Sequence, residues 1–117
     1  MAELKMMKAL DIDAREVILE GVEGVTIRWL ISKDDDAPNF AMRLFEVAPG
    51  GHSPLHRHDW EHEVYIVDGT GELEYEGDRR PFEKGWFLLV PPGREHRFVN
   101  TGDDALRFLC LVPNDSY

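Results

Sequence analysis

The stretch that decides the fold is HRHDWEHEVYIVDG, from His56 to Gly69, in which three histidines precede an apolar run that ends at a glycine. In an extended chain, side chains two residues apart share a face, so His56 and His58 point the same way. If the chain stays extended, His62 returns to that face four residues later, while Glu63 falls on the other side. Three imidazoles can therefore converge directly ahead of a strand.

The rest of the chain predicts an all-β domain. From residue 24 onward, short apolar runs alternate with the turn segments DGTG, EGDRRP, PPGR and NTGDD, a pattern typical of a β-sandwich or barrel. The expected strands are 25–31, 40–47, 62–67, 72–76, 86–90, 96–100 and 106–112. Nothing beyond the first twenty residues favours a helix.

Two of these runs, WFLLV at 86–90 and LRFLCLV at 106–112, are apolar on both faces. One face of such a strand can fill a barrel, but the other must also meet protein. At this chain length a second subunit is the simplest cover, so the sequence predicts a homodimer.

Size and charge restrict the partners. The 117 residues correspond to one ordinary domain, and a net charge of −10 would repel both nucleic acid and anionic membranes. No apolar run approaches the ~20 residues needed to cross a bilayer, and the amino terminus lacks the apolar core of a signal peptide. A single cysteine fits a reducing compartment, so we expect a cytoplasmic protein. With nucleic acid and membranes disfavoured, the expected partner is a small molecule.

The histidines also belong to two spaced motifs that resemble those of the cupin superfamily. The first motif is a glycine, an H-x-H pair, an acid and a second glycine, and its positions hold Gly50, His56, His58, His62 and Gly69, with histidine in the slot of the acid. The second motif is matched at every position, by Gly85, Pro91, Gly93, His96 and Asn100. Fifteen residues separate the motifs, as in small single-domain cupins of the cupin 2 type.

This resemblance implies an antiparallel double-stranded β-helix, or jelly-roll barrel, over residues 24–117. Residues 1–23 are then a short N-terminal extension that adds a strand or contacts a dimer partner. The resemblance also supplies a fourth ligand, because the histidine of the second motif faces the H-x-H pair from across the barrel in cupins. That residue is His96 here.

The third ligand has two candidates. Cupins often use glutamate at this position, and Glu63 is available, but strand alternation and the spacing to Gly69 favour His62. The sequence is also similar to four-histidine, manganese-binding cupins that carry the same W-E-H-E stretch. The expected cofactor is therefore one divalent transition metal ion per chain, manganese by resemblance, while iron, nickel, cobalt, copper and zinc also suit imidazole ligands.

Three other side chains are candidates for the pocket. Cys110 is expected to be a buried small hydrophobe, although its strand face would bring it near the metal if that face is the interior. Arg43 shares a face with Phe45 and Val47, yet an outward, salt-bridged arginine is the expected arrangement, with an anion anchor as the alternative. His52 precedes the motif and is expected to lie in a loop, outside the ligand set.

The predicted ligand set allows three kinds of function. Four neutral imidazoles leave a divalent ion its full charge and two open positions, which favours an oxidoreductase that uses dioxygen or peroxide. A non-oxidative isomerase or lyase is a second possibility, and a non-catalytic module that binds a metabolite or metal is a third.

Overall fold

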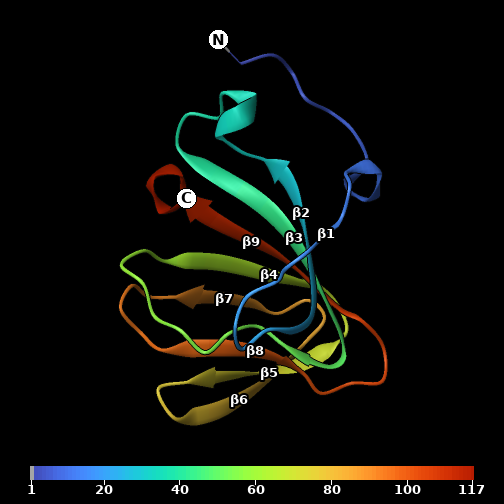
Figure 1. Cartoon of the computed structure of the whole chain (residues 1–117), viewed down its shortest axis with the longest axis vertical. Helices are drawn as coiled ribbons and strands as arrows, with labels where there is room; N and C mark the ends of the chain where they lie inside the picture. Colours follow the sequence, from blue (N-terminus) through green and yellow to red (C-terminus); the bar gives the residue numbers. More distant parts are fainter. Residues whose placement is uncertain (1) are drawn as a thin grey trace.

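The computed structural model describes residues 2–117 and is built almost entirely of strands (Figure 1). The strands are β1 (Arg15–Glu16), β2 (Glu23–Ile31), β3 (Phe40–His52), β4 (His62–Asp68), β5 (Thr70–Tyr75), β6 (Asp78–Glu83), β7 (Phe87–Val90), β8 (His96–Asn100) and β9 (Leu106–Pro113). Short 3₁₀ helices occupy Ala9–Asp11 (η1), Lys33–Asp35 (η2) and Asn114–Ser116 (η3). No helix within the described chain has the length and apolarity to span a membrane.

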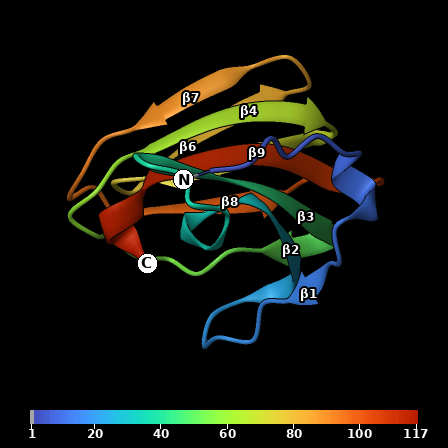
Figure 2. The ribbon, with the colours of Figure 1, turned by 90° about the horizontal axis from the view of Figure 1, so that it is seen from above.

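All strand pairs are antiparallel, in the order β6-β5-β8-β3-β9-β4-β7. Off this order, β2 pairs with β3, and β1 pairs with β2. The sheet curls until its two ends, β6 and β7, line one shared hollow. Seen from above, β1 and β2 lie on the side opposite β4 and β7 (Figure 2). The predicted all-β antiparallel barrel is therefore confirmed.

The core lies inside this curl because the strands alternate buried and exposed side chains, as half-buried strands do. On β4, β8 and β9 every second residue points inward, and these residues are His62, Val64, Ile66, His96, Phe98, Asn100, Leu106, Phe108, Cys110 and Val112. The inward set thus contains two of the predicted ligand histidines.

Strand β6 is the one barrel strand that the sequence did not predict. Phe82 is its single buried residue and Pro81 interrupts it, so the apolar alternation that predicts the other strands is missing here. Pro is tolerated here because β6 lies at an edge of the sheet. The β5–β6 turn contains Glu76 and Gly77, both with positive φ (48° and 87°), as tight hairpins of the type I′ class require.

The last residue of the second motif, Asn100, ties three segments together. Its side chain is 3% exposed, and its Nδ2 donates to the carbonyls of Val47 and Asp104, each at 2.9 Å. Its Oδ1 accepts from the backbone N–H of Gly102 at 2.8 Å. One amide group therefore connects β8 to β3 and shapes the turn before β9.

Replacing Asn100 by Ala removes three hydrogen bonds and leaves buried backbone groups unpaired. We expect the free energy of unfolding to fall by about 3 kcal/mol, measured by urea denaturation. The matched control is Asn39→Ala at an exposed position, where surface substitutions change stability by about 0.5 kcal/mol or less. Equal effects of the two substitutions would contradict the role given to Asn100.

Candidate metal centre

The four predicted ligand histidines come together at one place in the barrel. His56 and His58 lie in the loop between β3 and β4, His62 begins β4, and His96 begins β8. One ring nitrogen from each lies within 4.8 Å of the others. The predicted convergence across the barrel is therefore confirmed.

The ring orientations are fixed by hydrogen bonds on the outer side of the group. His58 Nδ1 lies 3.0 Å from the carbonyl oxygen of Trp60, and His96 Nδ1 lies 2.8 Å from that of Arg94. If each Nδ1–H donates to its carbonyl, each Nε2 is left with a free lone pair toward the centre. The Trp60 ring stacks on His58 at a centroid separation of 4.3 Å and holds that imidazole in place.

The nitrogens at the centre fit a metal ion. His96 Nε2 is buried and has no hydrogen-bond partner among the described residues, which is costly for a polar atom unless something binds there. His62 Nε2 and His58 Nε2 are 2.8 Å apart. Two nitrogens that bind adjacent positions of one ion at about 2.1 Å are about 3 Å apart, so the spacing suits shared coordination.

Burial keeps these imidazoles neutral, which is the protonation state that binds metals. Burial, with smaller contributions from the other imidazoles, lowers the pKa of His56 to about 4. Burial, then His58 and Arg43, lowers the pKa of His62 to about 2. Burial also lowers the pKa of both His58 and His96.

The structure distinguishes the two candidates for the third ligand. His62 is 8% exposed and points into the histidine group, whereas Glu63 is exposed on the outer face between Leu89 and Leu111. The chain bends at Asp59 and Trp60, so the extended segment assumed in the sequence argument is wrong. His62 points inward because it belongs to the alternation of β4.

His56, His62 and His96 line a cavity of about 240 Å³. Its other walls are largely apolar and include Val25, Ile27, Phe45, Val47, Phe98 and Phe108. The Phe108 ring stacks with Phe98 and Phe45, at centroid separations of 4.6 and 5.3 Å. No aspartate or glutamate is among the lining residues. A larger hollow of about 430 Å³, between η1 and Trp29, shares no lining residue with this cavity.

Arg43 and Cys110 also line the cavity, so the expectation of an outward, salt-bridged Arg43 is wrong. The two residues are direct partners on β3 and β9, and Arg43 Nη2 donates to Cys110 Sγ at 3.0 Å. Cys110 Sγ lies 3.1 Å from Nδ1 of His62, on the side of that ring away from His58 Nε2. Burial raises the pKa of the Cys110 thiol, and Arg43 opposes this only in part. The strand parity that Arg43 shares with Phe45 was the correct signal.

His52 lies at the end of β3 and is not part of the histidine group. Its Nδ1 is 3.2 Å from the carbonyl oxygen of Ser53. It was expected in a loop, but β3 extends five residues beyond the predicted strand end at Val47 and includes it.

Comparison with known proteins identifies the family. The cupin domain model matches residues 43–112, and the chain belongs to this family. The chain is 38% identical over 71 residues to 1-methylthio-D-xylulose 5-phosphate methylsulfurylase of Rhodospirillum rubrum, covering 61% of this chain and 46% of that protein, so it spans about half of that relative.

Two further relatives match over more of their length. The chain is 33% identical over 92 residues to the oxalate-binding protein of Thermotoga maritima, covering 75% of this chain and 74% of the relative. The structure of the polyketide cyclase RemF from Streptomyces resistomycificus superposes with a TM-score of 0.89 at 34% identity, covering 95% of this chain and 80% of the other.

The lowered histidine pKa values predict how stability of the metal-free protein depends on pH. An unfolded chain protonates its histidines near pH 6.5, while the folded chain keeps His56 neutral down to about pH 4 and His62 to about pH 2. The unfolded state therefore binds more protons than the folded state below pH 6.5. The free energy of unfolding then decreases by about 1.4 kcal/mol for each such imidazole with every unit by which the pH is lowered.

Chemical denaturation between pH 7 and pH 5 measures this slope. His62→Gln removes one of the contributing imidazoles, so its slope is expected to be shallower than that of the wild type. A slope unchanged by His62→Gln would show that this imidazole is not held neutral by the fold.

Proposed function

We propose that the chain is a mononuclear, metal-dependent cupin enzyme in which His56, His58, His62 and His96 hold one divalent ion. The observation that carries this proposal is the buried His96 Nε2, which lacks a hydrogen-bond partner among residues 2–117 and lies within 4.8 Å of possible ligand atoms from the other three histidines. An ion held by four neutral imidazoles keeps its +2 charge and would polarise an oxygen of a bound molecule. Manganese is favoured by resemblance, and iron, nickel, cobalt, copper and zinc fit the same nitrogens.

The cavity supports a small organic substrate with an apolar, preferably aromatic, body. Stacked rings from Phe45, Phe98 and Phe108 offer surfaces for such a body beside the histidines. A volume of about 240 Å³ is below the ~300–1,000 Å³ typical of sites for drug-sized ligands. The site therefore suits a small molecule, or one end of a larger one, whose oxygen reaches the histidine group.

We infer a non-oxidative reaction at a carbonyl-bearing molecule as the first candidate. It is supported by the likeness to the polyketide cyclase RemF over 95% of the chain and by the aromatic cavity wall. An oxidoreductase is the second candidate. It is supported by the four-histidine group, because four imidazoles on a six-coordinate ion leave two positions, which could hold a substrate and dioxygen or peroxide side by side.

Turnover of aromatic and polyketide-like ketones separates these candidates. Product formation with redox-inert Zn(II) under anaerobic conditions supports the non-oxidative reaction. Product formation that requires Mn(II) or Fe(II) and consumes dioxygen or peroxide supports the oxidoreductase. Tight binding of a ketone without product formation would indicate a non-catalytic binding module. The likeness to an oxalate-binding protein suggests this role.

The ligand set itself is tested by metal analysis. We expect one divalent ion per chain in the wild type. Removing a residue that only hydrogen-bonds to a metal ligand typically lowers metal affinity about 10–100-fold. His96→Ala removes a proposed ligand itself, so its metal affinity is expected to fall by more than that. His52→Ala is the matched control, since His52 lies outside the group. Equal losses in both variants, or a wild type that takes up no ion, would contradict the proposed centre.

We also propose that two copies associate through the outer face of β4, β7 and β9. Tyr65, Phe87 and Leu89 are 49%, 81% and 65% exposed there. Tyr65 pairs with both Phe87 and Leu109, so the apolar side chains are contiguous. The described chain has no α-helix to cover this face. A two-fold dimer would bury the same patch on both subunits.

Phe87→Asp places a charge in this patch and is expected to convert the dimer to a monomer. Light scattering after size-exclusion chromatography measures the mass. The control is Leu55→Asp, at a residue that is 50% exposed in the loop between β3 and β4, and it is expected to remain dimeric. A wild type that is monomeric at micromolar concentration would rule out this interface.

A further inference from the structure

Arg43 carries a charge that the protein does not neutralise with a carboxylate. Its Nη2 donates to Cys110 Sγ at 3.0 Å, and its Nε is buried without a hydrogen-bond partner in the described part of the chain. It forms no ion pair with any of residues 2–117. By contrast, Arg28 and Arg107 on the outer face of the sheet both contact Glu46, at 3.7 and 3.4 Å.

A partly buried guanidinium without a carboxylate partner destabilises the fold unless a ligand supplies the missing acceptors. The rings of Phe45 and Trp29 lie 4.9 and 5.4 Å from the guanidinium carbon and stabilise the cation in part. A partly buried guanidinium still needs acceptors for its remaining N–H groups, and no acidic side chain lines the cavity. The chain has a net charge of −10, yet its cavity places a cation next to four neutral histidines.

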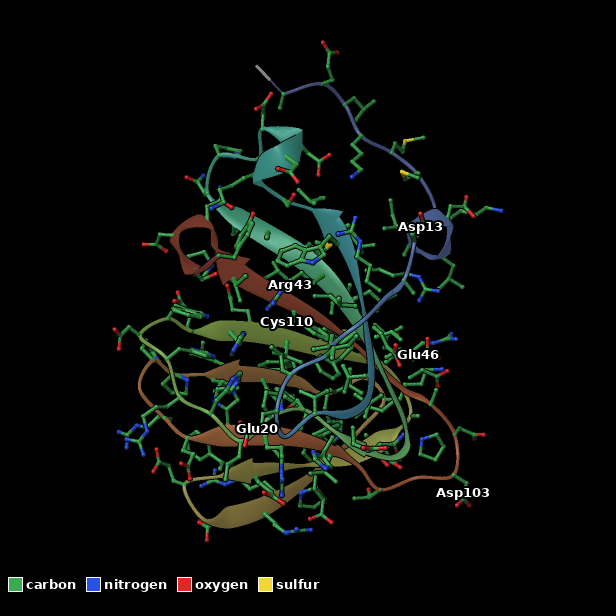
Figure 3. All side chains as sticks on the ribbon, in the orientation of Figure 1. Asp13, Glu20, Arg43, Glu46, Asp103 and Cys110 are labelled. Carbon is green, nitrogen blue, oxygen red and sulfur yellow. The ribbon has the colours of Figure 1, made fainter. Side chains whose placement is uncertain are left out.

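The cation is close enough to the histidine group for one ligand to reach both. Cys110 Sγ lies between Arg43 Nη2 and His62 Nδ1, at 3.0 and 3.1 Å. Figure 3 shows Arg43 and Cys110 beside each other on their neighbouring strands. A single thiol therefore links the guanidinium to a proposed metal ligand, on the wall of the same cavity.

We propose that Arg43 is an anion-binding residue that selects small aromatic or apolar molecules bearing a carboxylate, enolate or phenolate oxygen. The guanidinium donates to the anionic group, the phenylalanine rings hold the apolar body, and a second oxygen faces the histidines. This inference deepens the proposed function and names the substrate class of the same site. It requires that the charge of Arg43 be available to a ligand and not neutralised by Cys110.

The test is calorimetric titration with benzoate and with benzamide, which have the same ring but differ in charge. In protein loaded with Zn(II), Arg43→Gln is expected to weaken benzoate binding by about 10- to 100-fold and to change benzamide binding by less than about 3-fold. Arg107→Gln is the matched control, since it removes a guanidinium from the outer face of the neighbouring strand. Thermal unfolding and metal content of each variant establish that the site is intact.

The outcomes separate this inference from the metal proposal. If the protein binds zinc but Arg43→Gln and Arg107→Gln lose benzoate affinity equally, or not at all, the inference is overturned and the metal centre stands. If the protein binds no zinc, the metal centre fails, and the same titrations of the metal-free protein still test Arg43. Benzoate binding that appears only in Cys110→Ala would show that the Cys110 thiol occupies the guanidinium in the wild type, which also overturns the inference.

Discussion

The site depends on the backbone bridge between His56 and His96. Their N–H and carbonyl groups are paired in both directions, at 3.2 and 2.9 Å, although His56 lies outside any regular strand. The same irregular loop is fixed to β8 by Ser53, whose N–H and Oγ pair with the backbone of Phe98 at 2.9 Å each. These bonds attach a loop that carries two of the proposed ligands to a strand that carries another. Without them the imidazoles of distant segments would have no common position.

Preorganisation in this protein has an energetic cost. His96 Nε2 and Arg43 Nε are both buried without partners among the described residues, and each such atom destabilises the ligand-free fold. The surrounding barrel offsets this cost through the buried aromatic stack of Phe98 and Phe108 and through side chains such as Ile66 and Leu106, which are fully enclosed. The unpaired polar atoms lie next to the cavity. A ligand bound there could supply the missing partners and so stabilise the fold.

The strands and the grouping of His56, His58 and His62 were predicted from local alternation, whereas the closed barrel and His96 were implied by the resemblance of the two spaced motifs to those of cupins. His62 was placed correctly since β4 alternates regularly, although the assumed extended path from His58 is broken by a bend. Strand β6 was missed because Phe82 alone carries its apolar pattern. Arg43 was placed outward because arginines are mostly exposed, although it shares a strand face with the inward residues Phe45 and Val47. Its true environment requires knowing that Cys110 is its cross-strand partner, a long-range pairing that no local pattern contains.

The walls of the cavity explain why family membership does not determine the substrate. The family match begins at residue 43 and includes all four histidines, whereas Val17, Leu19, Val25 and Ile27 line the same cavity from outside it. Val17 is held by a hydrogen bond from its N–H to the carbonyl of Val25 at 2.9 Å, next to the short β1–β2 pair. The cavity therefore crosses the predicted boundary between residues 23 and 24. Since the proposed metal centre comes from the shared barrel and part of the wall from the extension, cupins with the same histidines can accept different molecules when their extensions differ.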